Sequence, residues 1–273
     1  MNFDPQTEIK SKRLSVFEIL QTTGYILRNN FRKIFLLCFI VQVLILTVSF
    51  FIPSDLIFYI DPGSTFTPTA LKRLINVMVL SLGTQICFAP LITAGLTNIC
   101  EKTLSGEKVT SGFILESTLL KWWKLAATAL ICTVLTLLGS ILILPAIYFG
   151  IVFCFSTNVA SRSNKWGASA LTRSMAIISG RTIKTLGWLI VVLVIESISQ
   201  VFLTFVLSFI LGLIFRMAVV SSPGMVFFIS VFIPALISAF CAVFPVILCV
   251  LYLNYEYSFD REMTPTIDES EEQ

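Results

Sequence analysis

The chain has 273 residues, of which 56% are hydrophobic, and its mean hydropathy is +0.90 while its net charge is only +3. Apolar runs of this length exceed what a soluble fold needs, and the residues outside them are too few to build a core of their own. The sequence contains no histidine, which excludes Ser-His and Cys-His catalysis, histidine-ligated haem and the usual zinc sites.

Long stretches without any charged residue predict an integral membrane protein. A spanning helix needs about 20 mostly apolar residues, because each residue rises about 1.5 Å and the hydrocarbon core is about 30 Å thick. The uncharged stretch 125–161 is too long for one crossing, and Pro145 near its middle predicts a tight hairpin there. The six expected spans are 34–52, 74–98, two within 125–161, 186–215 and 225–252.

Three segments that precede spans predict amphipathic helices at the cytoplasmic membrane interface. The first begins at Ser15, where Ser15 and Glu18 fit a capping box. The second is 113–124, whose two adjacent tryptophans lie beside lysines, as interfacial anchors do. The third is 165–178, which is too short and too basic to cross the bilayer.

The expected fold is therefore an all-α integral membrane protein, with six transmembrane helices in three hairpins, each preceded by a cytoplasmic interfacial amphipathic helix. The expected organisation is a cytoplasmic N-terminal segment with an interfacial helix (1–33), a six-span membrane domain (34–257) and a short acidic cytoplasmic tail (258–273). The acidic residues just beyond the span ends, Glu256, Asp260 and Glu262, are expected to lie in water.

The basic residues are sorted by side, which predicts the orientation. All but three of the 19 Lys and Arg residues fall on one face of this topology, and the opposite face keeps only Lys72, Arg73 and Arg216. Because cytoplasmic loops carry the excess of Lys and Arg, both termini are expected in the cytoplasm. No cleavable signal peptide precedes the first span, and that span is expected to act as the insertion signal.

Glu196 is the one ionisable residue deep within a predicted span. Such a residue usually faces the interior of the helix bundle, because a charge in hydrocarbon is costly. Together with Gln200, Gln42 and Gln85 it forms a candidate intramembrane polar seam. The seam has two interpretations, an ion, proton or polar-solute site, or a hydrogen-bond network that only holds the helices together, and the second fits a lone acid better.

The loop 162–184 has five cations and no acid, and it predicts contacts with anionic lipid headgroups. Cations near an anionic leaflet contribute about 1 kcal/mol each to membrane attraction. The same charges also serve to set the topology. The candidate headgroup contacts are Arg162, Lys165, Arg173, Arg181 and Lys184.

Several motifs resemble one family of membrane proteins. They are the run LILPAIY at 142–148, the segment ALTRSMAIISGR at 170–181, FEIL at 17–20 with RNNF at 28–31, and Pro90 followed by AGL at 94–96. In these the chain is similar to the superfamily of six-span bacterial proteins that includes YciC-like proteins and the membrane domain of some glycerophosphodiester phosphodiesterases. Ala146 stands where that superfamily usually has glycine. The resemblance implies a six-span fold in a bacterial cytoplasmic (inner) membrane, and the phosphodiesterase catalytic barrel is absent.

Two functions of different classes remain open at this point. The first is a non-enzymatic cytoplasmic-membrane protein that organises lipids or partner membrane proteins. Its expected partners are membrane lipids, anionic ones among them, a membrane-protein partner or a second copy of the chain. The second is a small-solute or ion transporter that uses the polar seam around Glu196. An intramembrane enzyme ranks lowest, since no nucleophile with a base and no accessible acid–base pair is apparent. No cofactor, no metal site and no nucleic-acid partner is expected.

The topology predicts the labelling of two engineered cysteines in spheroplasts. Asn2→Cys should be protected from a membrane-impermeant thiol reagent, whereas Ser222→Cys should react, because the two positions are expected on opposite faces. Labelling of position 2 from outside would contradict the orientation.

Overall fold

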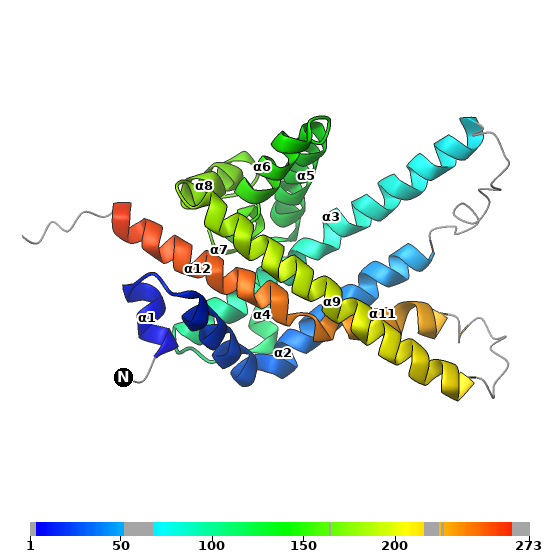
Figure 1. Ribbon diagram of the computed structural model, residues 1–273, viewed down its shortest axis with the longest axis horizontal. Helices are drawn as coiled ribbons and strands as arrows, with labels where there is room; N and C mark the ends of the chain where they lie inside the picture. The colour runs from blue at the N-terminus through cyan, green and yellow to red at the C-terminus, as the bar shows by residue number, and fades with distance from the viewer. Residues whose placement is uncertain (1–3, 52–67, 164, 216–223, 225–226, 264–273) are drawn as a thin grey trace, which may run out of the picture.

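The chain folds into helices throughout the part that the structure, a computed structural model, describes, which is residues 4–51, 68–163, 165–215, 224 and 227–263 (Figure 1). The predicted all-α class is therefore confirmed for these residues. The elements are α1 (Pro5–Ser11), α2 (Val16–Phe50), α3 (Pro68–Leu104), α4 (Ser111–Leu119), α5 (Trp122–Gly139), α6 (Ile143–Val152), α7 (Ser156–Arg162), α8 (Ala168–Ile178), α9 (Thr182–Phe215), the π-helical turn η2 (Phe228–Phe232), α11 (Ile233–Phe240) and α12 (Val243–Met263).

Five helices of the described chain are long and apolar enough to cross a membrane, and a sixth crossing results if one bent pair counts as a single span. The five are Val16–Phe50, Met78–Leu104, Trp122–Gly139, Leu144–Arg162 and Thr182–Leu207, and the bent pair is Phe228–Phe240 with Val243–Met263, at 43°. The polytopic membrane character predicted from the uncharged stretches agrees with these helices. Helix α12 continues beyond 257 to Met263, and the rest of the predicted acidic tail, 264–273, lies outside the described residues.

Helix α2 begins where the sequence predicts and continues without a break. The capping box is confirmed, because the Ser15 N–H donates to the Glu18 carboxylate at 2.7 Å and the Glu18 N–H donates to Ser15 Oγ at 3.4 Å. The expected interfacial helix is not a separate element, however. It forms the first half of α2, since no proline interrupts residues 16–50 and the helix runs directly into the uncharged stretch.

The second expected interfacial helix, 113–124, is divided in the structure. Helix α4 ends at Leu119, and Trp122 and Trp123 belong to the first turn of α5. The Trp122 indole donates to the carbonyl of Cys87 on α3 at 2.7 Å, and the Trp123 ring meets Trp166 edge to face at 5.0 Å. The tryptophans thus pack against their neighbours at the start of this candidate span.

The third expected helix starts three residues late, as α8. Gly167, in a positive-φ conformation (59°), precedes it, and its N–H donates to Thr128 Oγ1 at 2.8 Å. Glycine adopts this backbone without the Cβ penalty of other residues. The α8 side chains that are buried are Ala170, Leu171, Ser174, Ile177 and Ile178.

Helices α5 and α6 are joined by a turn of three residues, slightly before the predicted position. Helix α5 ends at Gly139 and α6 begins at Ile143, so Pro145 lies in the first turn of α6 and not in the loop. The first-turn N–H groups of a helix have no intrahelical acceptor, and proline is therefore tolerated there.

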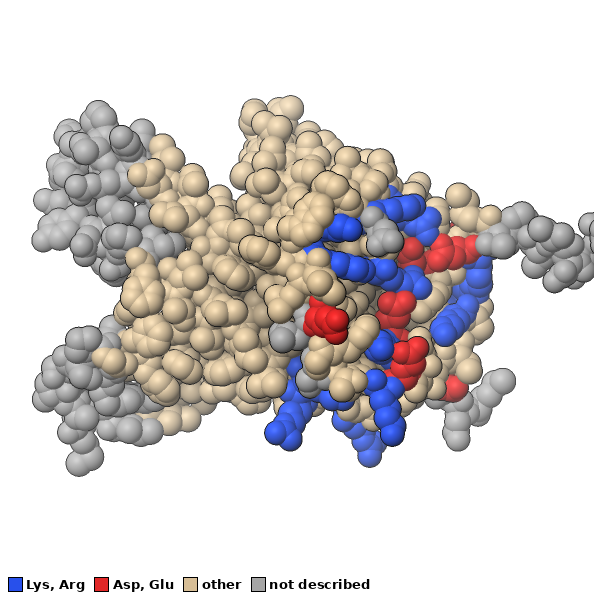
Figure 2. Space-filling model, turned by 180° about the vertical axis from the view of Figure 1, so that it is seen from behind, with Lys and Arg blue, Asp and Glu red and all other residues tan. Residues whose placement is uncertain are grey.

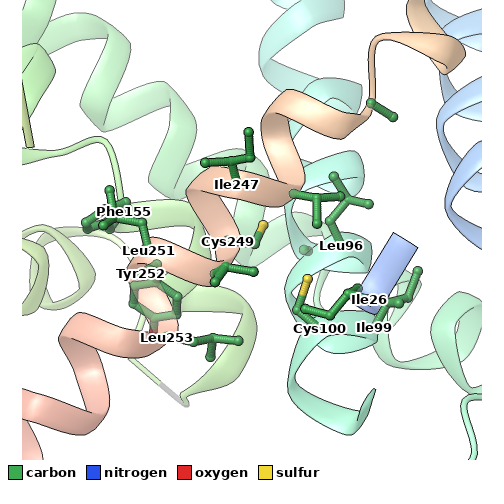
Figure 3. Close-up of a cluster of buried hydrophobic side chains, with 14 of the residues drawn as sticks. Ile26, Leu96, Ile99, Cys100, Phe155, Ile247, Cys249, Leu251, Tyr252 and Leu253 are labelled. Atoms are coloured by element: carbon green, nitrogen blue, oxygen red, sulfur yellow. The ribbon is translucent and has the colours of Figure 1, made fainter. Parts of the chain in front are cut away.

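The core lies where α2, α3 and α12 meet. Figure 3 shows Ile26 of α2, Leu96, Ile99 and Cys100 of α3, and Ile247 to Leu253 of α12 converging, with Phe155 beside Tyr252. The Phe155 and Tyr252 ring centroids are 5.6 Å apart. By contrast α9 exposes large apolar side chains along most of its length, among them Ile190, Leu193 and Phe205. The side chains are thus packed most closely around α12 and least closely along α9.

Two glycines provide a test of the α5–α6 turn. A Cβ on Gly139 would meet backbone atoms of Pro145 and Ala146 at 3.2 and 3.1 Å, whereas a Cβ on Gly150 would meet nothing within 4 Å. We expect Gly139→Ala to destabilise the protein by about 1–3 kcal/mol, as overpacking does, and Gly150→Ala to be neutral or slightly stabilising. Thermal unfolding in detergent measures both. Equal melting temperatures for the two variants would contradict the close approach at Gly139.

Candidate functional site

Charged side chains gather at one end of the molecule. On the face seen in Figure 2, the Lys, Arg, Asp and Glu side chains gather on one half of the described surface, and the other half of the described surface is uncharged. Helix α1, the start of α2, the end of α3, α8, the start of α9 and the end of α12 supply these residues. The six-span expectation places the same residues on one face, the cytoplasmic one.

The cationic loop 162–184 is not without acids once the chain is folded. Arg162 Nε donates to Glu101 at 2.8 Å, across from the end of α3. Arg173 reaches α12 and binds Glu256 at 2.9 Å and Asp260 at 2.5 Å. Arg181 pairs with Glu262 at 3.0 Å, so three of the five predicted headgroup contacts are engaged within the protein.

The expectation that the acids of α12 lie in water is wrong for Glu256. Glu256 is only 7% exposed, and the Arg173 guanidinium neutralises its carboxylate. The Cζ atom of that guanidinium lies 4.4 Å from the centre of the Phe259 ring. A buried carboxylate is tolerated only when it is paired. The pairing joins residues that are 83 positions apart, which no sequence spacing indicates.

Asn254 fastens the N-terminal segment to α12. This residue is 2% exposed, its side-chain carbonyl accepts from the Leu14 N–H at 3.2 Å, and its amide donates to the carbonyls of Ile9 (3.4 Å) and Lys12 (3.1 Å). These three partners are backbone groups of α1 and of the segment that joins α1 to α2. Sequence reasoning missed Asn254, although one amide in the apolar run 243–255 was a signal for a buried polar contact.

Near the end of α12, Glu262 forms ion pairs with two further arginines, Arg13 and Arg181. Its Oε1 accepts from Arg13, from Arg181 at 3.0 Å and from Ser258 Oγ at 3.1 Å. Arg181 also donates to Ser258 at 3.2 Å and follows Gly180, whose positive φ of 75° turns the chain from α8 into α9. The start of α2 and the start of α9 are thereby held beside α12.

A groove of about 650 Å³ lies between these three helices. Its charged lining, which we call the rim, is formed by Arg13, Arg181 and Lys184. Ser15, Asn254 and Tyr255 add uncharged polar groups, and the remaining lining is apolar. The volume is in the range of pockets that hold small ligands. The apolar wall consists of Leu14, Val16, Ile19, Trp188, Val191 and Leu251, with Gly187 among them.

The rim carries more cations than acids. Arg13 and Arg181 share one carboxylate, Glu262, and Lys184 adds a third cation with an exposed side chain. Burial and the neighbouring Arg13 guanidinium lower the pKa of Arg181 from its ordinary value, although a guanidinium stays protonated at any physiological pH. The groove therefore has a positive mouth and an apolar interior, an arrangement that suits an anion with an apolar tail.

Of the other predicted headgroup contacts, Lys165 is exposed and lies just before α8. Lys165 does not line the groove, so the structure brings only Arg181 and Lys184 of the five together there. Arg13 was not predicted for this role, because it belongs to the N-terminal segment and reaches the groove only through folding.

The four residues of the predicted polar seam are distributed over three helices. Glu196 and Gln200, on α9, approach each other at 3.5 Å. Gln85 of α3 lines a cavity of about 300 Å³ whose other walls come from α3, α5 and Thr157 of α7. Gln42 is half-buried on α2, and among the described residues no hydrogen bond joins Gln42 or Gln85 to Glu196. The structure pairs the two α9 residues and leaves the two glutamines elsewhere.

Among the described residues, no group of three or more His, Cys, Asp or Glu side chains is arranged to hold a metal ion. No family model, no curated protein and no solved structure matches the chain.

The Arg173–Glu256 pair predicts a stability effect that a second substitution reverses. We expect Arg173→Gln to cost about 2 kcal/mol, below the 3–5 kcal/mol typical of breaking a fully buried pair, because Asp260 is half-exposed. Adding Glu256→Gln should restore part of the loss, since the buried carboxylate that lost its arginine is then replaced by a neutral amide. Thermal unfolding of the single and double variants in detergent tests this. Additive losses in the double variant would contradict the pairing.

Proposed function

We propose that this chain is a non-enzymatic, multi-pass protein of the bacterial cytoplasmic membrane that organises anionic lipids at its cytoplasmic face. In this proposal six transmembrane helices form three hairpins, and both termini lie in the cytoplasm. The motif resemblance to the YciC-like superfamily supports this topology and location. A membrane-protein partner or a second copy of the chain remains part of the proposal, and the exposed apolar length of α9 is the surface suited to it.

The distribution of charge supports a lipid-facing role for one end. Apolar side chains are exposed right beside the cations, such as Val16 (61%) in the first turn of α2 and Ile183 (86%) next to Lys184. Exposed apolar residues interleaved with Lys and Arg are typical of protein surfaces that lie among lipid headgroups. A water-exposed surface would leave these side chains hydrated.

The observation that carries the proposal is the groove between α2, α9 and α12. It joins three cations at its rim, opposed by one acid, to a wall of aliphatic and aromatic side chains. An anionic lipid has the same division, with a charged headgroup above apolar chains. Electrostatic attraction to the leaflet and burial of apolar area act together at such a surface.

Transport is the second candidate function. It would need a polar path through the membrane, for which Gln85 and the threonines of its cavity offer one part and Glu196 with Gln200 another. These parts lie on different helices, α3 with α5 and α7 in the first case and α9 in the second. Loss of pH-driven flux in proteoliposomes on Glu196→Gln, with folding intact, would favour transport over the proposed role.

Lipid analysis of the purified protein tests the proposed function. After extraction from native membranes in a mild detergent, the protein should retain phosphatidylglycerol or another anionic lipid well above its share in the membrane, and zwitterionic lipid should wash away. The reason is that each headgroup contact with a cation adds about 1 kcal/mol to retention. A bound lipid fraction with the composition of the bulk membrane would contradict the proposal.

A further inference from the structure

We propose that the groove between α2, α9 and α12 is a built site for one anionic glycerophospholipid, whose phosphate lies between Arg13, Arg181 and Lys184 and whose acyl chain lies along Trp188 and Val191. This inference rests on the proposed function and goes further, because it assigns one site, one ligand class and a competing group within the protein.

The rim geometry favours a phosphate. Arg13 and Arg181 both donate to the same carboxylate oxygen, Glu262 Oε1, so their guanidinium groups already converge on one acceptor atom. A phosphate presents several acceptor oxygens and fits the forked donors of arginine. Lys184 lies on the first turn of α9, on the same rim, and adds a third cation.

The apolar lining of the groove suits an acyl chain. Below the rim the wall is apolar, and Val191 is half-exposed on α9, whose next turns continue as exposed aliphatic residues. A chain that enters between α9 and α12 can therefore continue into the bilayer along α9. Burial of apolar area contributes about 25 cal/mol per Å², so a lipid gains from this wall whereas free phosphate does not.

Glu262 acts as the internal competitor in this scheme. It holds Arg13 and Arg181 with half of its own side chain exposed, so an incoming phosphate can displace it towards water. Lipid binding would then break the ion pairs of Glu262 with Arg13 and Arg181. The C-terminal end of α12 would therefore differ between the empty and the occupied site.

Binding of phosphatidylglycerol to the purified full chain, measured by native mass spectrometry against phosphatidylcholine, tests the site. One phosphatidylglycerol should be retained, and Lys184→Gln should weaken it about fivefold. Lys108→Gln is the matched control, because Lys108 is an exposed lysine of the same charged end that lies outside the groove, and it should leave binding unchanged. Glu262→Gln should strengthen binding, since it removes the competing charge.

A second variant tests the apolar half without loss of charge. A Cβ on Gly187 would meet no atom within 4 Å, so Gly187→Leu fills the groove while it suits the helix. It should abolish retention of the lipid and leave the melting temperature in detergent unchanged or higher. Gly83→Leu, at an equally open position on α3, should bind as the unsubstituted protein does.

The outcomes separate this inference from the proposed function. If phosphatidylglycerol is preferred but Lys184→Gln and Gly187→Leu behave like their controls, the groove is not the site and the general lipid role stands. If phosphatidylglycerol and phosphatidylcholine bind equally, both proposals fail. Displacement of the lipid by inorganic phosphate alone would overturn the lipid assignment, and so would a dimer that Gly187→Leu dissociates, because a second copy would then occupy the groove.

Discussion

The exclusion of charge from hydrocarbon is the constraint on which this structure depends, and the end of α12 is where the chain satisfies it. Glu256, Asp260 and Glu262 bind arginines from α8, from the start of α9 and from the segment before α2. Asn254 adds hydrogen bonds to the same segment. One helix thus holds both the N-terminal segment and the turn from α8 to α9, directly beside the best-packed part of the core.

This arrangement gives α12 two tasks that compete at Glu262. As a structural residue it neutralises Arg13 and Arg181 and closes the bundle at its charged end. As a carboxylate at the mouth of a cationic groove it occupies the place that an anionic headgroup would take. In the proposed site, the exchange of Glu262 for a lipid phosphate keeps Arg13 and Arg181 paired in both states, and the displaced carboxylate moves into water.

The elements of the fold that follow from local chemistry could be predicted from the sequence. The uncharged stretches identified the apolar helices, Ser15 with Glu18 predicted the start of α2, and the excess length of 125–161 indicated a turn between two helices. The exact turn was missed because proline is as acceptable in the first turn of a helix as in a loop. The prediction of a separate interfacial helix before the first span was wrong, because an amphipathic segment and a span can share one continuous helix.

The site depended on long-range pairing and could be predicted only in part. Arg181 and Lys184 were predicted as headgroup contacts from the one-sided charge of their loop, and the structure places both at the groove. Arg13, Glu262 and Asn254 gave no such signal, because their partners lie far away in the sequence. Glu196 drew attention as an ionisable residue within a span. Folding pairs it with Gln200 on its own helix, and the groove forms elsewhere, at the charged end.

The most direct test of the account is the depth of this charged end in a bilayer. Trp166 lies beside Lys165 and contacts Trp123 at the start of α5, so it reports on the level of the cationic elements. In a variant that keeps Trp166 as its only tryptophan, fluorescence quenching by lipids brominated at different depths gives that level. The account predicts strongest quenching by bromines nearest the headgroups. Strongest quenching by bromines at the bilayer centre would contradict it.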